Sequence, residues 1–195
     1  MRENNKQFKR VFIAVKIYPD SYFLSWFKQV KEILKKEDIR WTKLENLHLT
    51  LLFLGDTDVE LIPAIITALK KAVAASGPFR FSLTGIGVFR SLRYPRVLWT
   101  GIKETDKLGL IKLNIDNSLK SLLSLDEPGT FKPHLTLGRM RRIHDFDLLK
   151  NLISKYSDHE FMEVEVNEII FYESILSKSG PVYEVIETIP FPDQT

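Results

Sequence analysis

The sequence contains no cysteine, and that absence excludes several kinds of chemistry at once. It rules out disulfide bonds, zinc sites built on thiolates and catalysis by a cysteine nucleophile. It also fits a protein of the cytosol, where disulfides are rare, so we expect a cytoplasmic location. Long apolar runs are lacking too, because the one that follows the basic first ten residues is short and is interrupted by Lys16. We therefore expect neither a signal peptide nor a membrane span.

Other specialised features are also scarce. The 195 residues include only four histidines, and no Gly-x-Ser-x-Gly motif marks a serine nucleophile. Hydrophobic residues make up 44% and charged residues 27%, which is typical of a globular domain. The formal net charge of +3 is a mild bias. It is compatible with a solvated surface or with a patch that faces a polyanion.

Two of the four histidines lie in the same tetrapeptide, His-Leu-Thr-Leu, which occupies residues 48–51 and again 134–137. Both copies sit in runs where apolar residues alternate with polar ones. Side chains of a β-strand point alternately to its two faces, so each copy is predicted to be a strand with one face in a core. The other face then carries a histidine and a threonine: His48 with Thr50, and His134 with Thr136.

The remaining pattern predicts an α+β fold built from a duplicated unit. Predicted strands cover residues 11–17, 47–54, 79–89, 97–102, the second motif, 161–176 and 182–189, and predicted helices cover 22–36, 59–75, 107–123 and 146–156. The motifs are 86 residues apart, from position 48 to position 134, and their flanking elements repeat at a similar shift. We expect residues 1–195 to form one bilobed domain, with halves of roughly 20–102 and 105–189 related by a pseudo-twofold. Antiparallel sheets would line a central cleft with the helices outside, in a monomer.

Two imidazoles and two hydroxyls around one small anion suit the hydrolysis of a phosphodiester, especially a strained cyclic one. One histidine can take a proton from water while the other protonates the leaving oxygen, because the usual imidazole pKa of about 6.5 allows both forms near neutral pH. The threonine hydroxyls can hold the non-bridging oxygens. No metal or other cofactor is needed, and no carboxylates cluster at the motifs to provide a metal site.

A single His-x-Thr would carry little weight, because histidine and threonine in a strand are ordinarily structural. Two identical copies at equivalent places in a repeat are a much stronger signal. The other two histidines, His144 and His159, have no repeated partner, and we expect them to be solvated.

The paired motifs resemble those of the 2H phosphoesterase superfamily. More narrowly, the chain is similar to the RNA 2′,3′-cyclic phosphodiesterases, also called the LigT-like or 2′-5′ RNA ligase family. The similarity extends over nearly the whole chain, through the segments VFIAVKI, IRWTKLENLHLTLLFLG, RVLWTGI, FKPHLTLGR and FYESILSKSGPVYEVIE.

This resemblance implies hydrolysis of a 2′,3′-cyclic phosphate, at an RNA end or in a small cyclic nucleotide, to a 2′-phosphomonoester. It implies that His48 is the proton donor, that His134 is the proton acceptor, and that Thr50 and Thr136 bind the phosphate. Arg139, in the Gly-Arg after the second motif, matches a family position near the phosphate. Strict alternation puts Arg139 on the face opposite His134, so it reaches the site only if the strand bends at Gly138.

Two further groups could contact RNA. Arginine suits phosphate geometry, although exposed arginines are commonly only solvated. The candidates lie in a basic loop and in the run after the second motif, and they are Arg90, Arg93, Arg96, Arg141 and Arg142. Trp41, Phe53 or Tyr94 could stack on a terminal base, although an aromatic residue in a strand is more often in the core. Two other functions stay open: a nucleotide- or RNA-binding module without turnover, and a 2′-5′ RNA ligase that runs the reaction in reverse.

Overall fold

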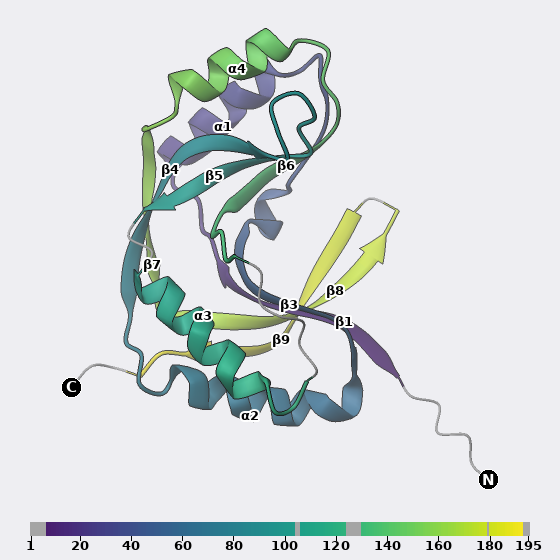
Figure 1. Ribbon diagram of the computed structural model, residues 1–195, viewed down its shortest axis with the longest axis vertical. Helices are drawn as coiled ribbons and strands as arrows, with labels where there is room; N and C mark the ends of the chain where they lie inside the picture. The colour runs from purple at the N-terminus through teal and green to yellow at the C-terminus, as the bar shows by residue number, and fades with distance from the viewer. Residues whose placement is uncertain (1–6, 104–105, 124–129, 179, 193–195) are drawn as a thin grey trace.

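The computed structural model describes residues 7–103, 106–123, 130–178 and 180–192. Within them the chain forms one strongly curled antiparallel sheet and four α-helices (Figure 1). The strands are β1 (Phe8–Lys16), β2 (Asp38–Trp41), β3 (His48–Asp58), β4 (Phe79–Phe89), β5 (Val97–Lys103), β6 (Leu135–Arg142), β7 (Glu160–Val166), β8 (Glu168–Ser177) and β9 (Gly180–Pro190). The helices are α1 (Ser21–Ile33), α2 (Ile62–Val73), α3 (Asp106–Leu119) and α4 (Phe146–Lys155), with short 3₁₀ turns η1 (Leu44–Asn46) and η2 (Val59–Leu61). The expected α+β class is confirmed.

The two motif strands lie next to each other at the centre of the sheet. The strand order is β7-β4-β5-β6-β3-β1-β8-β9, and β2 pairs separately with β6. β3 and β6 pair only at Leu49 and Leu135, so the two sides of the sheet are joined through a single short contact. The sheets expected to line a cleft are thus parts of one continuous curled sheet.

The helices lie on the outside of the curled sheet, two at each end of the molecule. Figure 1 shows α1 and α4 at one end and α2 and α3 at the other. Helices α2 and α3 contact each other, and α1 contacts β7. None of the helices formed by the described residues is long and apolar enough to cross a membrane.

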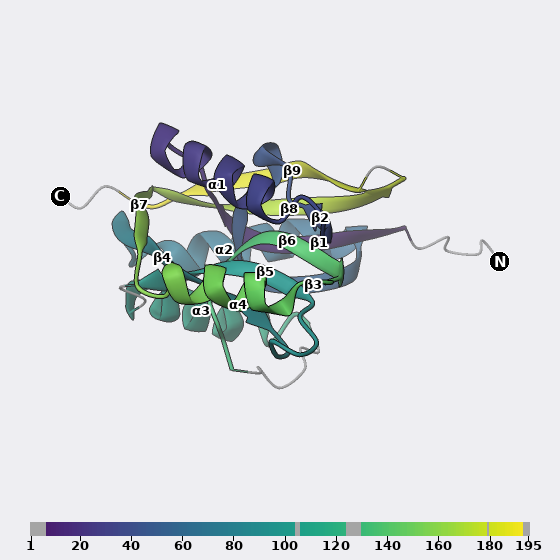
Figure 2. The same cartoon turned by 90° about the horizontal axis from the view of Figure 1, so that it is seen from above.

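Strand pairing links the two proposed halves of the chain. β4, from the first half, pairs with its neighbour β5 on one side and with β7, from the second half, on the other. β8, from the second half, pairs with β1 near the N-terminus, and Figures 1 and 2 both show β8 and β9 beside β1. Each side of the sheet therefore contains strands from both ends of the sequence. The half boundaries of 20–102 and 105–189 stay a prediction.

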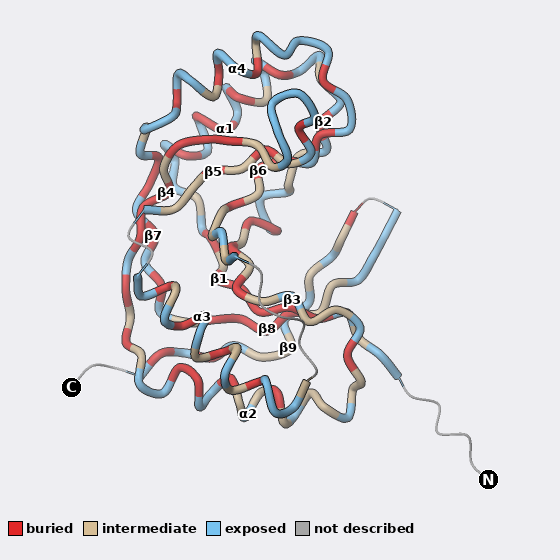
Figure 3. The backbone as a smooth tube through the Cα atoms, viewed as in Figure 1, coloured by how far each residue is buried: buried red, intermediate tan, exposed pale blue. Residues whose placement is uncertain are grey.

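Local sequence signals explain where two helices begin. The Asp20 side chain accepts a hydrogen bond from the Phe23 amide at 2.7 Å, and Asp145 accepts one from the Leu148 amide at 2.8 Å. These contacts satisfy amides that have no partner inside the helix. The apolar face of α1 then packs into the main core, which Figure 3 shows as buried backbone along the sheet and the inner faces of the helices.

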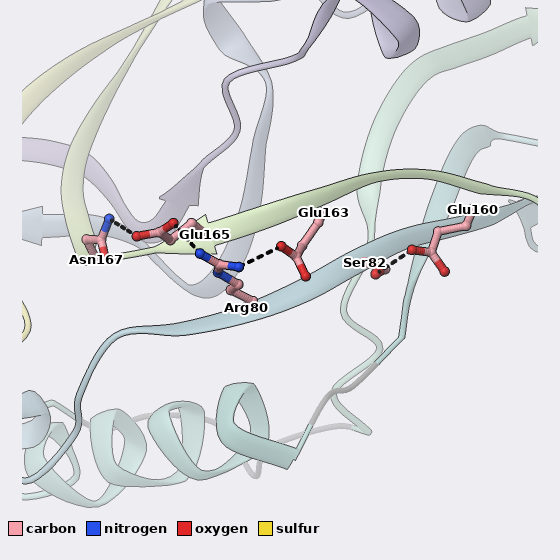
Figure 4. A network of polar contacts seen from close by, with 6 residues as sticks. All are labelled: Arg80, Ser82, Glu160, Glu163, Glu165 and Asn167. Carbon is pink, nitrogen blue, oxygen red and sulfur yellow. Dashed lines mark hydrogen bonds and ion pairs between the residues drawn. The ribbon is translucent and has the colours of Figure 1, made fainter.

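The edge strand β7 carries charged residues that pair with a residue of β4. Arg80 lies 3.1 Å from Glu163 and 3.2 Å from Glu165, and Asn167 donates a hydrogen bond to Glu165 (Figure 4). Ser82 donates a hydrogen bond to Glu160 farther along the same strand pair. Exposed pairs of this kind add little to stability, but charge on an edge strand discourages pairing with other chains.

Candidate active site

The histidines and threonines of the two motifs face the same side of the sheet. The intervening leucines point into the core on the other side. These leucines, all at most 2% exposed, are Leu49, Leu51, Leu135 and Leu137. The alternation predicted from the sequence therefore holds through each motif, and His48, Thr50, His134 and Thr136 all line one cavity.

A β-bulge follows the threonine in each motif strand. The pairing of β1 with β3 skips Leu51, and the pairing of β5 with β6 skips Leu137. An extra residue changes which face the following side chains occupy. As a result Phe53 and Arg139, each three residues after the motif threonine, also line the cavity. The bend needed to bring Arg139 to the site is therefore present, in the bulge that immediately precedes Gly138.

The cavity has a volume of about 330 Å³ and is basic. Its other described lining residues are Phe12, Arg40, Trp41, Thr42, Lys43, Asn46, Ser174, Gly180, Pro181 and Tyr183. They include no carboxylate, and nowhere in the described chain do three or more histidine, cysteine, aspartate or glutamate residues form a group that could hold a metal ion. Arginines, lysine, hydroxyls and imidazoles instead favour a small anion such as a phosphate.

Both imidazoles are held by the same local contact. His48 Nδ1 lies 2.6 Å from the carbonyl oxygen of Asn46, and His134 Nδ1 lies 2.8 Å from that of Lys132. In each case the carbonyl belongs to the residue two positions earlier. Because a carbonyl can only accept, Nδ1 carries the proton and donates it. Nε2 is then the ring nitrogen that is left for proton transfer in the cavity.

Burial lowers the pKa values of both histidines. It lowers the pKa of His48 to about 4, with further lowering by the charges of Lys16, His134 and Arg139, while the hydrogen bond to Asn46 acts in the opposite direction. Burial is also the main cause that lowers the pKa of His134, and Arg139 adds to it. Both rings are therefore neutral at neutral pH when the cavity holds no anion.

Comparison with known proteins matches this chain to a family. Residues 17–99 match the family model described as LigT like Phosphoesterase. The chain is 34% identical over 178 residues to a protein of Methanocaldococcus jannaschii named RNA 2′,3′-cyclic phosphodiesterase, covering 91% of this chain and 98% of that protein. A protein of Archaeoglobus fulgidus with the same name is 35% identical over 179 residues, covering 90% and 96%. The chain belongs to the LigT-like phosphoesterase family.

Solved structures agree on the fold of this LigT-like chain. The protein TT0787 of Thermus thermophilus matches with a TM-score of 0.77 and 26% identity, covering 95% of this chain and all of that one. Escherichia coli LigT, in a complex with 3′-AMP, matches with a TM-score of 0.70 and 20% identity, covering 95% and 99%.

Aromatic side chains from other strands fix the two imidazoles. The rings of Phe12 and Tyr183 each lie 5.1 Å from that of His48, and Phe89 meets His134 edge-on at 4.6 Å. Each imidazole is thus held between a carbonyl and an aromatic ring, which limits its movement before substrate arrives. No sequence signal marks these neighbours, because they come from β1, β9 and β4.

Asn46 connects the first motif to the hairpin formed by β8 and β9. Its carbonyl accepts the hydrogen bond from His48, while its buried side chain donates one to the Pro181 carbonyl at 2.9 Å. The hairpin contributes Ser174, Gly180, Pro181 and Tyr183 to the cavity. Asn46 therefore holds this wall of the cavity and the His48 ring in a fixed relation.

The arginines predicted to bind RNA lie outside the cavity. All of them are exposed, and none lines it; they are Arg90, Arg93, Arg96, Arg141 and Arg142. The Arg93 guanidinium stacks over the Tyr94 ring instead, at 5.6 Å from its centre. Of the aromatic candidates, Trp41 and Phe53 line the cavity, whereas Tyr94 does not. A role for the loop in RNA binding stays a prediction.

The short strand β2 brings residues to the cavity that no sequence pattern marks. The sequence predicts only that Arg40 and Trp41 lead into the first motif, but residues 38–41 form β2, which pairs with β6. Only Ile39 of these four residues is buried, so the strand is too short to show an alternating pattern. Arg40 lines the cavity because of this pairing, and Lys43 follows it two residues after the strand ends.

The remaining histidines differ from each other. His144 is exposed as expected, and its ring lies 3.4 Å from Glu37. His159 is only partly solvated, because this residue is half-buried and its Nε2 lies 2.7 Å from the Tyr22 hydroxyl. Neither lines the cavity.

Proposed function

We propose that this protein hydrolyses 2′,3′-cyclic phosphodiesters at RNA ends or in nucleotides to 2′-phosphomonoesters. The observation that carries the proposal is the pair of imidazoles on adjacent central strands, each with Nδ1 held by a carbonyl and each lining one basic cavity. The names of the relatives at 34% and 35% identity support the same activity.

In the proposed mechanism the two histidines transfer protons on opposite sides of the phosphorus. His134 Nε2 takes a proton from water as the water oxygen bonds to phosphorus. The bond between phosphorus and the 3′ oxygen breaks, and His48 gives that oxygen a proton from its Nε2. Thr50, Thr136 and Arg139 hold the non-bridging oxygens, where negative charge increases in the transition state.

The proposed donor role requires that His48 is protonated in the complex. Its pKa of about 4 means that the proton must be acquired when the substrate binds. The negative charge of the phosphate favours the imidazolium, so substrate and proton are expected to bind together. A donor whose pKa lies near neutral in the complex is well matched to proton transfer at neutral pH.

We also propose that the reaction needs no metal ion. The donor set supports this, because the described lining of the cavity offers imidazoles, hydroxyls and cations but no carboxylate. Two cationic arginines would repel a divalent cation placed among them.

The test uses a nucleoside 2′,3′-cyclic phosphate in excess EDTA, with product identified by chromatography. We expect conversion to the 2′-monoester at an undiminished rate. His48→Ala and His134→Ala should each lower kcat/KM by about 10²- to 10⁴-fold. His144→Ala, which removes an exposed histidine outside the cavity, is the matched control and should have no effect.

Each proposal has its own refuting outcome. Loss of activity in EDTA would refute metal independence, and full activity of either cavity variant would refute the assigned roles. Binding of the cyclic nucleotide by the wild-type protein without any product would favour the binding module over the enzyme.

A further inference from the structure

Two arginines lie directly opposite each other beside the catalytic residues. Arg40 of β2 and Arg139 of β6 are paired in the antiparallel register, and both line the cavity. Cα atoms of paired residues are about 4.5–5.5 Å apart, and their side chains project from the same face of the sheet. Like charges in such positions repel each other, so the pair destabilises this part of the sheet unless an anion lies between or beside them.

The described residues provide no ion pair for either charge. Among the ion pairs of this part of the chain, none involves Arg40 or Arg139. Lys43, the third cation of the cavity lining, is different because its amine lies 3.7 Å from Glu45. Of the cations that line the described cavity, Arg40 and Arg139 are therefore the ones available to bind a ligand.

The hairpin of β8 and β9 leaves space for the guanidinium of Arg40. A Cβ atom on Gly180 would collide with Arg40 Nη2, and Gly180 has a φ of +125°. A side chain at residue 180 would displace the guanidinium, and its backbone conformation also favours glycine. The head group of this exposed arginine thus lies against Gly180 at the cavity wall.

The reacting phosphate does not account for both arginines. A 2′,3′-cyclic phosphate carries one negative charge, and Thr50, Thr136 and Arg139 are already assigned to its oxygens. Arg40 lies one strand farther from the motif residues of β6, on β2. An RNA substrate carries a second negative charge one nucleotide away, on the phosphodiester that joins the terminal nucleotide to its neighbour.

We propose that Arg40 binds this next phosphodiester, and that the cavity is therefore adapted to oligonucleotides that end in a cyclic phosphate rather than to mononucleotides. The inference rests on the proposed function. Arg40 is a specificity residue in this scheme: it contacts the chain next to the reacting nucleotide and takes no part in proton transfer. Arginine suits the role because its planar guanidinium can bind two phosphate oxygens at once.

The test compares three substrates that share the same terminal nucleotide. They are a nucleoside 2′,3′-cyclic phosphate, a dinucleotide with that terminus, and the same dinucleotide with an uncharged methylphosphonate linkage. We expect the wild-type protein to prefer the charged dinucleotide by about tenfold in kcat/KM, the effect of one charge-assisted contact. Arg40→Gln should abolish this preference, so its loss of kcat/KM on the charged dinucleotide should be about tenfold larger than its loss on either of the other two substrates.

The control is Arg80→Gln, which removes the same charge from an exposed arginine on β4 that lies outside the cavity. It should leave the preference intact. Equal losses of Arg40→Gln on all three substrates would show that Arg40 supports the structure or the reacting phosphate, and would overturn the proposal. An unchanged preference in Arg40→Gln would overturn it as well. The proposed function is tested separately, because it fails only if the wild-type protein hydrolyses none of the three substrates, so the two failures are distinguishable.

Discussion

A tetrahedral anion that enters the cavity is expected to raise the pKa of His48 by about three units. Without such an anion this pKa is about 4, because the ring is shielded from water and lies near Lys16, His134 and Arg139. Sulfate is a suitable probe, since it stays fully ionised near neutral pH and releases or takes up no protons itself. A shift measured with sulfate therefore belongs to the protein.

The magnitude follows from two opposing terms. Placing a proton on His48 at pH 7, about three units above its pKa, costs about 4 kcal/mol at 1.36 kcal/mol per unit. Each negative charge at about 4 Å from the imidazolium, in an effective dielectric of about 20, contributes about −4 kcal/mol; sulfate carries two, and the Arg139 guanidinium that lines the same cavity offsets about one of them. The two terms nearly cancel, so the pKa in the complex should lie near 7, with about half of the molecules protonated at that pH.

The assay is an NMR titration of the histidine ring nitrogens, with and without saturating sulfate, in protein labelled with ¹⁵N at histidine. His48→Asn identifies the His48 signals among the four histidines of the chain. A His48 pKa near the ordinary value of about 6.5 in the empty protein would refute the argument from burial. A low pKa that sulfate leaves unchanged would refute the coupling of proton and anion binding, and with it the proposed supply of the catalytic proton.

Three further predictions concern stability. Because folding lowers the pKa of His48, its contribution to the free energy of unfolding is complete above the unfolded value of about 6.5 and disappears as the pH falls from there towards 4. Between pH 7 and about pH 4.5, urea unfolding should show a decrease in the free energy of unfolding that is about 2–3 kcal/mol smaller in His48→Gln than in the wild type. Equal decreases in the two proteins would contradict the lowered pKa. Gly138→Val should destabilise the protein by about 1–3 kcal/mol in the same assay, because even a Cβ atom on Gly138 would lie 2.8 Å from Ile39 and force β2 away from β6; an unchanged midpoint would contradict this packing. Asn46→Ala should lower the free energy of unfolding by about 1 kcal/mol, because the hydrogen bond to Pro181 is lost, and should also lower kcat. A loss of stability with unchanged kcat would mean that the hairpin does not help to position His48.

The parts of the fold that the sequence predicts are those with local signals. Asp20 and Asp145 begin helices where their side chains cap the first turn, and the motif strands follow the period-two alternation of their leucines. The sequence does not predict β2, because four residues with one buried side chain are too few to show an alternating pattern. The sequence also does not predict that β4 pairs with β7 or that β8 pairs with β1, because strand pairing depends on contacts between residues far apart in sequence.

The candidate site shows the same division. His48 and His134 are predictable because a repeated motif marks them, and a resemblance to a family marks Arg139. No sequence motif identifies Arg40. It lines the cavity because β2 pairs with β6 in the register that places Arg40 opposite Arg139. Phe12 likewise reaches His48 only because β1 pairs with β3.

The bulges explain how a symmetric repeat can support an asymmetric reaction. Each motif strand has its extra residue at the last leucine of the motif, so the residue three positions after the threonine faces the cavity in both copies. That residue is Phe53 in the first strand and Arg139 in the second. The threonines and the carbonyl contacts of the histidines are equivalent, whereas these two side chains differ in charge. Arg139 lowers the pKa values of both imidazoles, but His48 is the more shielded ring and lies beside Lys16 as well. The environment therefore makes the imidazolium of His48 the stronger acid, which is the direction that the assignment of His48 as donor and His134 as acceptor requires.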